Sequence, residues 1–335
     1  MPIHFTPKCT NPRAGNRQKP MKIALCVLLF AGSAGAQMNP NTITEPVLGL
    51  VFDAGTQTLR TLMGIPAASR VGGTVDAGTP LHGVTISSER AYALALEDGS
   101  GAALLVSQSG RQALPGVRAG AQTMSVSPRG TAAALYYGDS GKAQILAGLP
   151  DAPQMVREVT LDGPPSVLAV SDDGTSLAAV VKQTDTDVTV FFYSPDGPGQ
   201  AVQRARRFTS LEFVPGSTTL LMATDAAAYL YQSRQGLQLL ADQRDGIASV
   251  VGAAASADGA RIFIAMQSGQ VAVRNVGDAT QTLLSCSCQP TGMWRLRGKA
   301  VFRLNDLSAG PIWVVDGDAA KPRVLFVAMP TGDNQ

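Results

Sequence analysis

The sequence predicts an all-β protein, and three observations support that prediction. About one residue in six is Gly or Pro, with 35 Gly and 21 Pro among 335 residues, which suits many short strands joined by tight turns. Hydrophobic residues make up 45% of the chain and charged residues only 16%, so a packed globular protein is expected and not a disordered chain. The third observation is an internal repeat.

The repeat consists of a short apolar strand, a polar turn and a second strand of small and β-branched residues. Four clear copies occupy residues 125–137, 169–181, 211–224 and 253–266, and weaker copies occupy residues 84–96 and 293–304. The equivalent turn positions are Ser87, Ser127, Ser171, Val214, Ser256 and Leu296, which lie 40, 44, 43, 42 and 40 residues apart. This period is typical of a four-stranded propeller blade.

A second hairpin follows each copy of the first, and an extra copy of this second type, residues 47–63, begins the repeats. Residues 71–75 are a further candidate strand for the first blade. Six inner and seven outer hairpins predict about 26 strands. We therefore expect a β-propeller of about seven blades, one of them incomplete, or alternatively six. Stacking such sheets around an axis buries both faces of each sheet.

The turns of three repeats resemble a known family. The segments 126–130 (VSPRG), 170–174 (VSDDG) and 255–259 (ASADG) look like the S-x-D-G turn of the WD40-like propellers of exported bacterial proteins, including the TolB-like and YVTN-type repeats. The resemblance covers most of residues 45–330 as a periodic pattern. It implies the propeller fold and export, and it implies little about function.

Residues 21–36 are typical of a cleavable signal peptide. Lys22 precedes an apolar run over residues 23–30, and Ala34-Gly35-Ala36 supplies small residues at the expected cleavage point. The apolar run is shorter than the roughly 20 residues that a bilayer crossing needs. We expect residues 1–20 to be a disordered upstream extension, 37–45 a linker, 46–330 the propeller and 331–335 a tail. The mature protein would be periplasmic or secreted.

Removal of that leader changes the charge of the protein. The first 36 residues carry five basic residues and no acidic one, which leaves 22 basic and 25 acidic residues, a net charge of about −3. The formal charge of +2 therefore gives no reason to expect a nucleic-acid or anionic-membrane partner. A monomer without a membrane span is expected.

Histidine limits the chemistry that the mature chain can perform. After removal of the leader only His82 remains, so a multi-histidine metal site is excluded and a Ser-His-Asp triad could form only around this residue. His82 precedes a predicted strand near a ring face, where functional loops gather, and it is a candidate binding residue. We expect neither a metal nor a cofactor.

Cys286 and Cys288 are the only cysteines outside the leader region. They could form a short-loop disulfide, remain free thiols or act as a redox pair. Residues two apart in a regular strand lie near the upper distance limit for a disulfide. A turn or bulge at Ser287 would therefore be required.

Two clusters of basic residues lie on different predicted blades. Arg204, Arg206 and Arg207 form the first cluster, which we take as a candidate binding site for an acidic group. The second consists of Arg295, Arg297, Lys299 and Arg303. The alternation of arginines in both equally suits the solvated side of an edge strand.

The leading functional hypothesis is an exported scaffold that binds another exported or envelope protein through its ring-face loops. The first alternative is an enzyme, either a lactonase-like hydrolase or an oxidoreductase with its site in the central channel. The second alternative is a binder of a small ligand or sugar in that channel. No recognisable set of catalytic residues stands out in the sequence, so we rank binding above catalysis.

Overall fold

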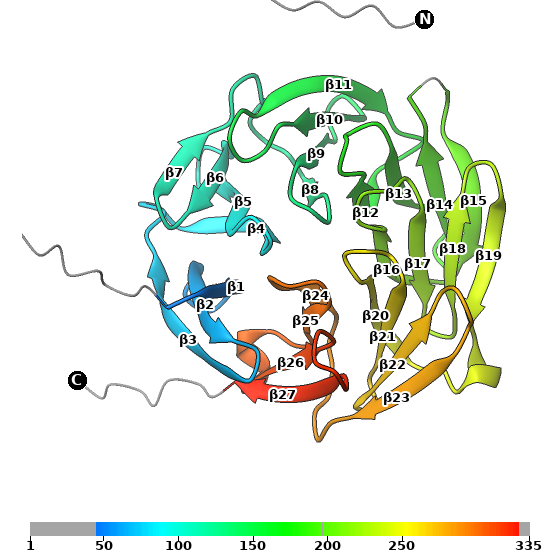
Figure 1. Ribbon diagram of the computed structural model, residues 1–335. Helices are drawn as coiled ribbons and strands as arrows, with labels where there is room; N and C mark the ends of the chain where they lie inside the picture. Colours follow the sequence, from blue (N-terminus) through cyan, green and yellow to red (C-terminus); the bar gives the residue numbers. More distant parts are fainter. Residues whose placement is uncertain (1–44, 196, 328–335) are drawn as a thin grey trace, which may run out of the picture. The chain divides into compact units, whose positions relative to one another are not determined.

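The computed structural model describes residues 45–195 and 197–327, and it shows a seven-bladed β-propeller (Figure 1). Six blades are four-stranded antiparallel sheets and the first is three-stranded. The predicted fold class, including one incomplete blade, is confirmed. The predicted extension, signal peptide and tail, and all of the predicted linker except Glu45, lie outside the described residues. In the described part of the chain, none of the helices has the length and apolar character that a membrane crossing requires.

Each blade is built from strands that are consecutive in the sequence. Blades 1 to 3 contain β1 (Val47–Asp53), β2 (Thr58–Ile65), β3 (Ala68–Val75), β4 (Leu81–Ser87), β5 (Tyr92–Glu97), β6 (Ala103–Ser107), β7 (Gly110–Ala113), β8 (Thr123–Val126), β9 (Ala132–Tyr137), β10 (Lys142–Ala147) and β11 (Gln154–Thr160). Blades 4 and 5 contain β12 (Pro165–Val170), β13 (Leu177–Lys182), β14 (Val188–Tyr193), β15 (Gln200–Ala205), β16 (Phe208–Phe213), β17 (Leu220–Thr224), β18 (Ala228–Gln232) and β19 (Gly236–Ala241). Blades 6 and 7 contain β20 (Val250–Ala255), β21 (Arg261–Met266), β22 (Gln270–Asn275), β23 (Gln281–Ser285), β24 (Trp294–Arg295), β25 (Val301–Arg303), β26 (Ile312–Asp316) and β27 (Arg323–Val327).

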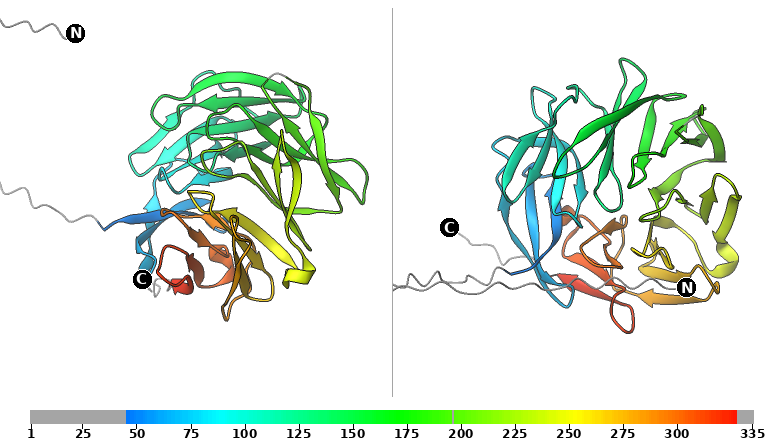
Figure 2. Two further views of the ribbon diagram at one scale, coloured as in Figure 1. Left: turned by 45° about the vertical axis from the view of Figure 1, so that its right-hand side comes forward. Right: turned by 45° about the horizontal axis from the view of Figure 1, so that its top comes forward.

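Seven apolar clusters hold the ring together, one between each pair of neighbouring blades. The first cluster joins blades 1 and 2, each following cluster joins the next two neighbours, and the seventh joins blades 7 and 1. In the last of these, Leu62 of blade 1 packs with Val314 of blade 7, and both are fully buried. The ring is therefore closed by side-chain packing between the first and last blades, which Figure 2 shows side by side in blue and red.

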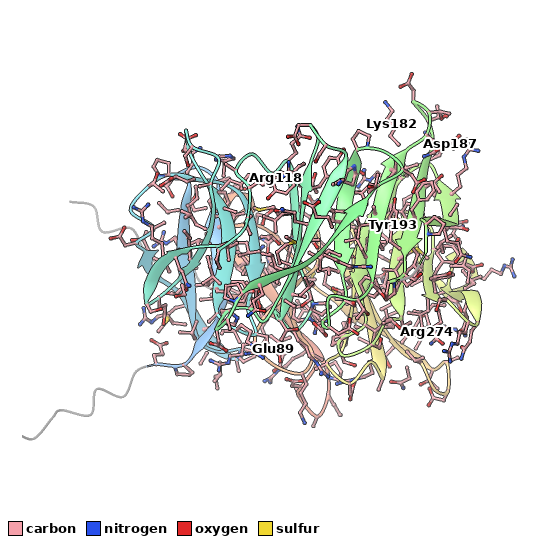
Figure 3. The ribbon with its side chains drawn as sticks, turned by 90° about the horizontal axis from the view of Figure 1, so that it is seen from above. Glu89, Arg118, Lys182, Asp187, Tyr193 and Arg274 are labelled. Atoms are coloured by element: carbon pink, nitrogen blue, oxygen red, sulfur yellow. A yellow bond between two sulfur atoms is a disulfide. The ribbon has the colours of Figure 1, made fainter. Side chains whose placement is uncertain are left out.

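The two faces of the ring carry different turns (Figure 3). The turn between the first and second strands of a blade lies on the lower face in this view, where Glu89 is labelled. The turn between the second and third strands lies on the upper face, where Lys182 and Asp187 are labelled.

Blade 1 lacks its innermost strand. Its β1–β2 turn contains Gln57, whose carbonyl accepts a hydrogen bond from Leu81 N at the upper-face start of β4 (3.4 Å). At the other end of β1, Leu48 O accepts from Arg297 N in the lower-face β24–β25 turn (2.7 Å). Strand β1 thus runs opposite to β4, as a second strand does. The prediction that residues 47–63 form an outer hairpin is wrong, because β1 and β2 are the second and third strands of their blade.

The repeated turn motif has a common hydrogen-bond pattern. The hydroxyl of Ser171 donates to Asp173 Oδ1 (2.6 Å) and accepts from Ser176 N (2.9 Å), and Ser256 does the same with Asp258 (2.5 Å) and Arg261 N (3.0 Å). The glycine that follows has a positive φ of about 70° in these turns. Such a φ disfavours a Cβ atom, which explains the glycine at this place in the repeat.

Candidate functional site

The axis of the ring contains a pocket of about 490 Å³. Its wall comes from the innermost strands of blades 2 to 5 and 7 together with β1, and from the 3₁₀ helix η2 (Leu307–Ala309) in the β25–β26 connection. Helix η2 contacts β1, so this loop and β1 together occupy the side of the channel where blade 1 has no innermost strand. The volume lies in the range of pockets that hold small molecules.

One side of the pocket is apolar. It is formed by Phe52, Val84, Ile86, Met124 and Val126, all of them partly exposed. The same side chains also pack against the apolar clusters between blades 1 and 2 and between blades 2 and 3. They offer a surface for the apolar body of a ligand.

The opposite side carries a buried pair of charges, Glu212 on β16 and Arg295 on β24 (side-chain exposure 25% and 9%). The Nη2 of Arg295 lies 3.4 Å from Glu212 Oε1 and donates to Ala255 O at 2.5 Å. Glu212 Oε1 also accepts from Ala255 N at 2.9 Å. Burial raises the pKa of Glu212, and the nearby Arg295 opposes this shift. The pair links the inner strands of blades 5, 6 and 7.

Several polar atoms around the pocket, on both of its sides, lack a hydrogen-bond partner. Nε and Nη1 of Arg295 and Oγ of Ser125 are buried and form no hydrogen bond with any described residue. Buried polar groups in proteins are almost always hydrogen-bonded. Arg295 therefore retains donor capacity that the protein does not use.

A second arginine, Arg303 on β25, supports the same wall. Its Nη1 donates to Asn305 O (2.8 Å) and to Asp306 Oδ1 (2.6 Å), and its guanidinium stacks 4.3 Å from the centre of the Trp294 ring. Burial lowers the pKa of Arg303 and the carboxylate of Asp306 opposes this. Trp294 itself is 37% exposed and lines the pocket, so a large aromatic surface remains available there.

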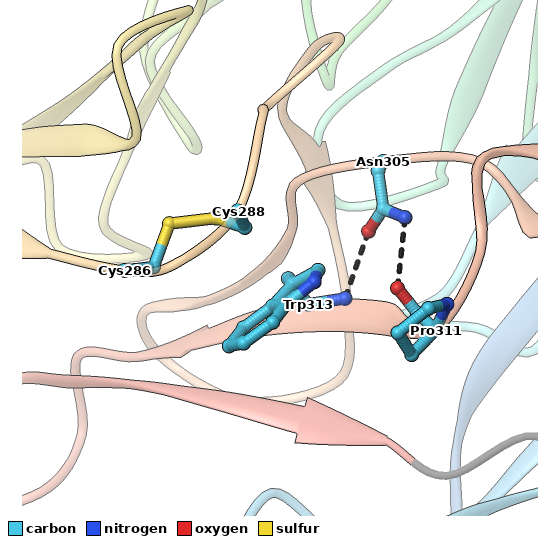
Figure 4. Close-up of a disulfide and its surroundings, with 5 residues drawn as sticks. All are labelled: Cys286, Cys288, Asn305, Pro311 and Trp313. Atoms are coloured by element: carbon cyan, nitrogen blue, oxygen red, sulfur yellow. Dashed lines mark hydrogen bonds between the residues drawn. A yellow bond between two sulfur atoms is a disulfide. The ribbon is translucent and has the colours of Figure 1, made fainter.

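The side chain of Asn305 also holds the loop that carries Asp306. Asn305 Oδ1 accepts from Trp313 N (2.8 Å), and its Nδ2 donates to Pro311 O (2.9 Å), as Figure 4 shows. The loop therefore has hydrogen-bonded ends, although Ser308 within it is exposed at the pocket.

The residues predicted for binding lie elsewhere. His82 is exposed near the start of β4, at the upper face. Arg204 forms an ion pair with Asp187 (2.9 Å), and Arg206 and Arg207 are exposed in the β15–β16 connection. No hydrogen bond or ion pair among the described residues joins His82 to these arginines. None of the four lines the axial pocket.

The second basic cluster divides in the structure. Arg297 and Lys299 are exposed in the β24–β25 turn, whereas Arg295 and Arg303 are buried at the axis. The solvated-edge interpretation is therefore wrong for the latter two. A usable signal was present for Glu212, which is the one charged residue of its strand and lies between Leu211 and Phe213. Arg295 and Arg303 instead belong to a cluster of four basic residues in the sequence.

Cys286 and Cys288 are joined by a disulfide immediately after β23 (Figure 4). Their Cα atoms are 5.1 Å apart because the chain bends here instead of continuing the strand. Cys288 packs against the apolar cluster between blades 6 and 7, which also includes Trp313. Within residues 45–327, apart from 196, no group of three or more His, Cys, Asp or Glu side chains is arranged to hold a metal ion.

Comparison with known proteins identifies the fold. No family model matches the chain, and no curated protein matches it. Among solved structures, a functionally unknown protein from Desulfotomaculum acetoxidans has 13% identity and a TM-score of 0.58, covering 84% of this chain and 96% of that one. Hsv2 of Kluyveromyces marxianus has 10% identity and a TM-score of 0.50 over 84% and 97%. At this level of identity the likenesses concern the fold alone, and they agree with a seven-bladed β-propeller.

Proposed function

We propose that this protein binds a small molecule in its axial pocket. The observation that carries the proposal is the pocket itself: about 490 Å³ at the ring axis, with an apolar wall facing a buried charged pair. Apolar pockets with a few convergent polar groups are the usual form of small-ligand sites. This was the second alternative from the sequence.

The arrangement supports binding more than catalysis. The carboxylates at the pocket already accept hydrogen bonds from the protein, Glu212 from Ala255 N and Asp306 from Arg303. Among the described residues, neither carboxylate forms a hydrogen bond with a Ser, Cys, His or Tyr side chain, which is the arrangement that activates a nucleophile. An enzyme of the lactonase or oxidoreductase type is therefore ranked below a binding protein.

A screen by thermal shift tests the proposal. Small organic acids, amines and neutral aromatic compounds are added to wild-type protein and to Ser308→Trp, in which an exposed residue at the pocket becomes bulky. Compounds that bind in the channel should raise the melting temperature of the wild type and not of this variant. Ser109→Trp, at an exposed turn outside the pocket, is the matched control. Hits that stabilise Ser308→Trp and wild type equally would place binding elsewhere.

A scaffold that binds an exported or envelope protein is a second candidate, favoured by the outer strand β19. Its Leu237 and Leu239 are 39% and 50% exposed on an edge strand, and exposed apolar edges are used in protein association. The test is binding of envelope proteins by wild type and by Leu237→Ser/Leu239→Ser. Equal binding by the two proteins would argue against this surface.

Export belongs to the same proposal and rests on residues 21–36 of the sequence. We expect cleavage near Ala36 and a periplasmic or secreted product. N-terminal sequencing of the protein recovered outside the cytoplasm tests this, and a product that retains residues 21–30 would contradict it.

A further inference from the structure

Resting on the proposed function, we infer that the axial pocket recognises an organic monocarboxylate with a flat apolar body, and that Arg295 binds its carboxylate. The inference starts from the four charged side chains of the pocket, which form one close ion pair and one longer one. Arg303 and Asp306 form a close ion pair at 2.6 Å, and Arg303 also has a backbone acceptor. Arg295 meets Glu212 at 3.4 Å through one nitrogen only.

The guanidinium of Arg295 has fewer hydrogen-bond acceptors around it than it has N–H donors. A guanidinium has five N–H donors and no acceptor. Contacts with described residues use Nη2 alone, while Nε and Nη1 have none, and the Phe302 ring lies 5.2 Å from the guanidinium carbon. Both nitrogens are covered by neighbouring atoms, so the guanidinium must turn toward the pocket before an anion can accept from them. A buried cation with unused donors is unfavourable, and an anion that accepts from it relieves this cost.

The composition of the pocket selects the kind of anion. A single guanidinium with spare donors matches a single negative charge, and no lysine lines the pocket to help balance a phosphate dianion. Carboxylates and guanidinium groups form planar, charge-assisted hydrogen bonds. The remaining walls suit a flat apolar body, with Ile86 and Met124 on one side and the half-exposed Trp294 ring on the other.

The experiment compares matched probes that differ only in charge. Isothermal titration measures benzoate against benzamide, and cinnamate against cinnamamide, with phenyl phosphate as the competing anion. We expect each acid to bind at least about tenfold more tightly than its amide, because a charge-assisted hydrogen bond replaces a neutral one. Weaker binding of phenyl phosphate than of benzoate is also expected.

Two substitutions identify the residue responsible. Arg295→Met should abolish the preference for acid over amide, while Arg297→Met, at an exposed position outside the pocket, should keep it. Since Arg295→Met also removes the bond to Ala255 O and could impair folding, Glu212→Gln provides an independent test. It keeps an acceptor for Ala255 N and removes the internal competitor for Arg295, so the acids should bind several-fold more tightly and the amides unchanged.

The outcomes separate this inference from the function on which it rests. Equal affinity of acid and amide in the wild type, unchanged acid affinity in Glu212→Gln, or preference for phenyl phosphate would overturn the carboxylate inference. If acid and amide bind equally and Ser308→Trp blocks both, the pocket still binds ligands and only its anion specificity is disproved. If none of the four acid and amide probes binds, the carboxylate inference is wrong, and the thermal-shift screen then decides whether the pocket binds anything.

Discussion

The regular blades and the seam between blades 7 and 1 are held together in different ways. In blades 3 to 5, the lower-face turns are tied to one another: Asp172 accepts from Arg129 N in blade 3 (2.7 Å) and from Gly216 N in blade 5 (2.6 Å). At the seam, one backbone hydrogen bond between described residues joins the lower-face β24–β25 turn to strand β1, from Arg297 N to Leu48 O. Apolar packing supplies the rest of the closure there.

The difference locates the candidate site. Where the repeat is regular, the inner strands bring mainly apolar residues and serines to the axis, together with Glu212 from blade 5. Where it breaks, β1 takes the inner place of blade 1, and blade 7 contributes Trp294, Arg295 and the loop with Asp306. Three of the four charged side chains at the channel, Arg295, Arg303 and Asp306, thus come from blade 7 at the seam, whereas the fourth, Glu212, comes from the regular blade 5.

The largest expected effect comes from a cavity at the seam. Leu62→Ala removes a fully buried side chain between blades 1 and 7 and should lower the free energy of unfolding by about 2–5 kcal/mol. Leu177→Ala, equally buried between blades 3 and 4, is the matched substitution in the regular part. Chemical denaturation of both measures the cost.

Hydrogen exchange then sharpens the comparison. If packing alone closes the ring, Leu62→Ala should increase exchange first in blades 1 and 7, whereas Leu177→Ala should do so around blades 3 and 4. Uniform exchange around the ring in both variants would mean that the seam is no weaker than the other interfaces.

Loss of the turn connection should cost less. Asp172→Ala leaves the N–H groups of Arg129 and Gly216 without their acceptor, and we expect a loss of about 1–3 kcal/mol in the free energy of unfolding. Asp185→Ala, which removes a carboxylate that is 97% exposed, should change stability by less than about 0.5 kcal/mol. Similar melting temperatures for the two variants would show that the turns do not connect the blades energetically.

Much of the fold could be predicted because each repeat is specified by residues that lie close together in the sequence. Turns such as Ser171 to Gly174 are specified by residues within five positions of one another. The place of β1 could not be predicted this way. An apolar hairpin has the same sequence pattern whether it forms the second and third strands of a blade or the third and fourth. Its position depends on contacts with Leu296 and Leu81, which lie outside the hairpin in the sequence.

The candidate site was harder to predict than the fold. Arg295 and Glu212 are 83 residues apart and meet only because the ring brings blades 5 and 7 to the axis. His82 and the Arg204 to Arg207 segment stood out by rarity and charge density, which mark exposed positions as readily as sites. For the axial pocket the signal was Glu212, a single charge within an apolar strand.

Within the regular blades, substitution of the turn glycine should lower the free energy of unfolding by less than the loss of the turn connection at Asp172. Gly174 has φ of 70°, and in Gly174→Ala the added Cβ would meet other atoms only at ordinary contact distances. The expected loss of about 1–2 kcal/mol in the free energy of unfolding therefore reflects backbone strain alone. Gly277→Ala, without a positive φ and with open space around it, should be neutral or slightly stabilising. Equal effects of the two would refute a conformational requirement at this turn position.

The smallest expected effect is the pH dependence of stability that arises from Asp258, a carboxylate in one of the regular turns. The hydroxyl of Ser256 and the N–H of Ala260 donate to Asp258, and they hold the pKa of this carboxyl below its usual value of 3.8. A lowered pKa in the folded state stabilises the protein above the pKa of the unfolded chain, and this stabilisation is lost as the pH falls through the folded value. Asp258→Asn should therefore be less stable than wild type by about 0.5–1 kcal/mol near neutral pH, an amount kept small by the exposure of this turn. The difference should begin to shrink below about pH 4, where Asp258 of the unfolded chain takes up a proton, and should disappear as the pH falls through the lower pKa of the folded state. Denaturation curves recorded over the range in which a carboxyl group titrates, about pH 2 to 7, measure this difference in stability.

The Ser256→Ala variant, which loses the main hydrogen-bond donor to Asp258, should show a weaker pH dependence of stability than wild type. A constant difference between Asp258→Asn and wild type across this range would mean that the turn stabilises the blade through its shape and not through the charge of Asp258.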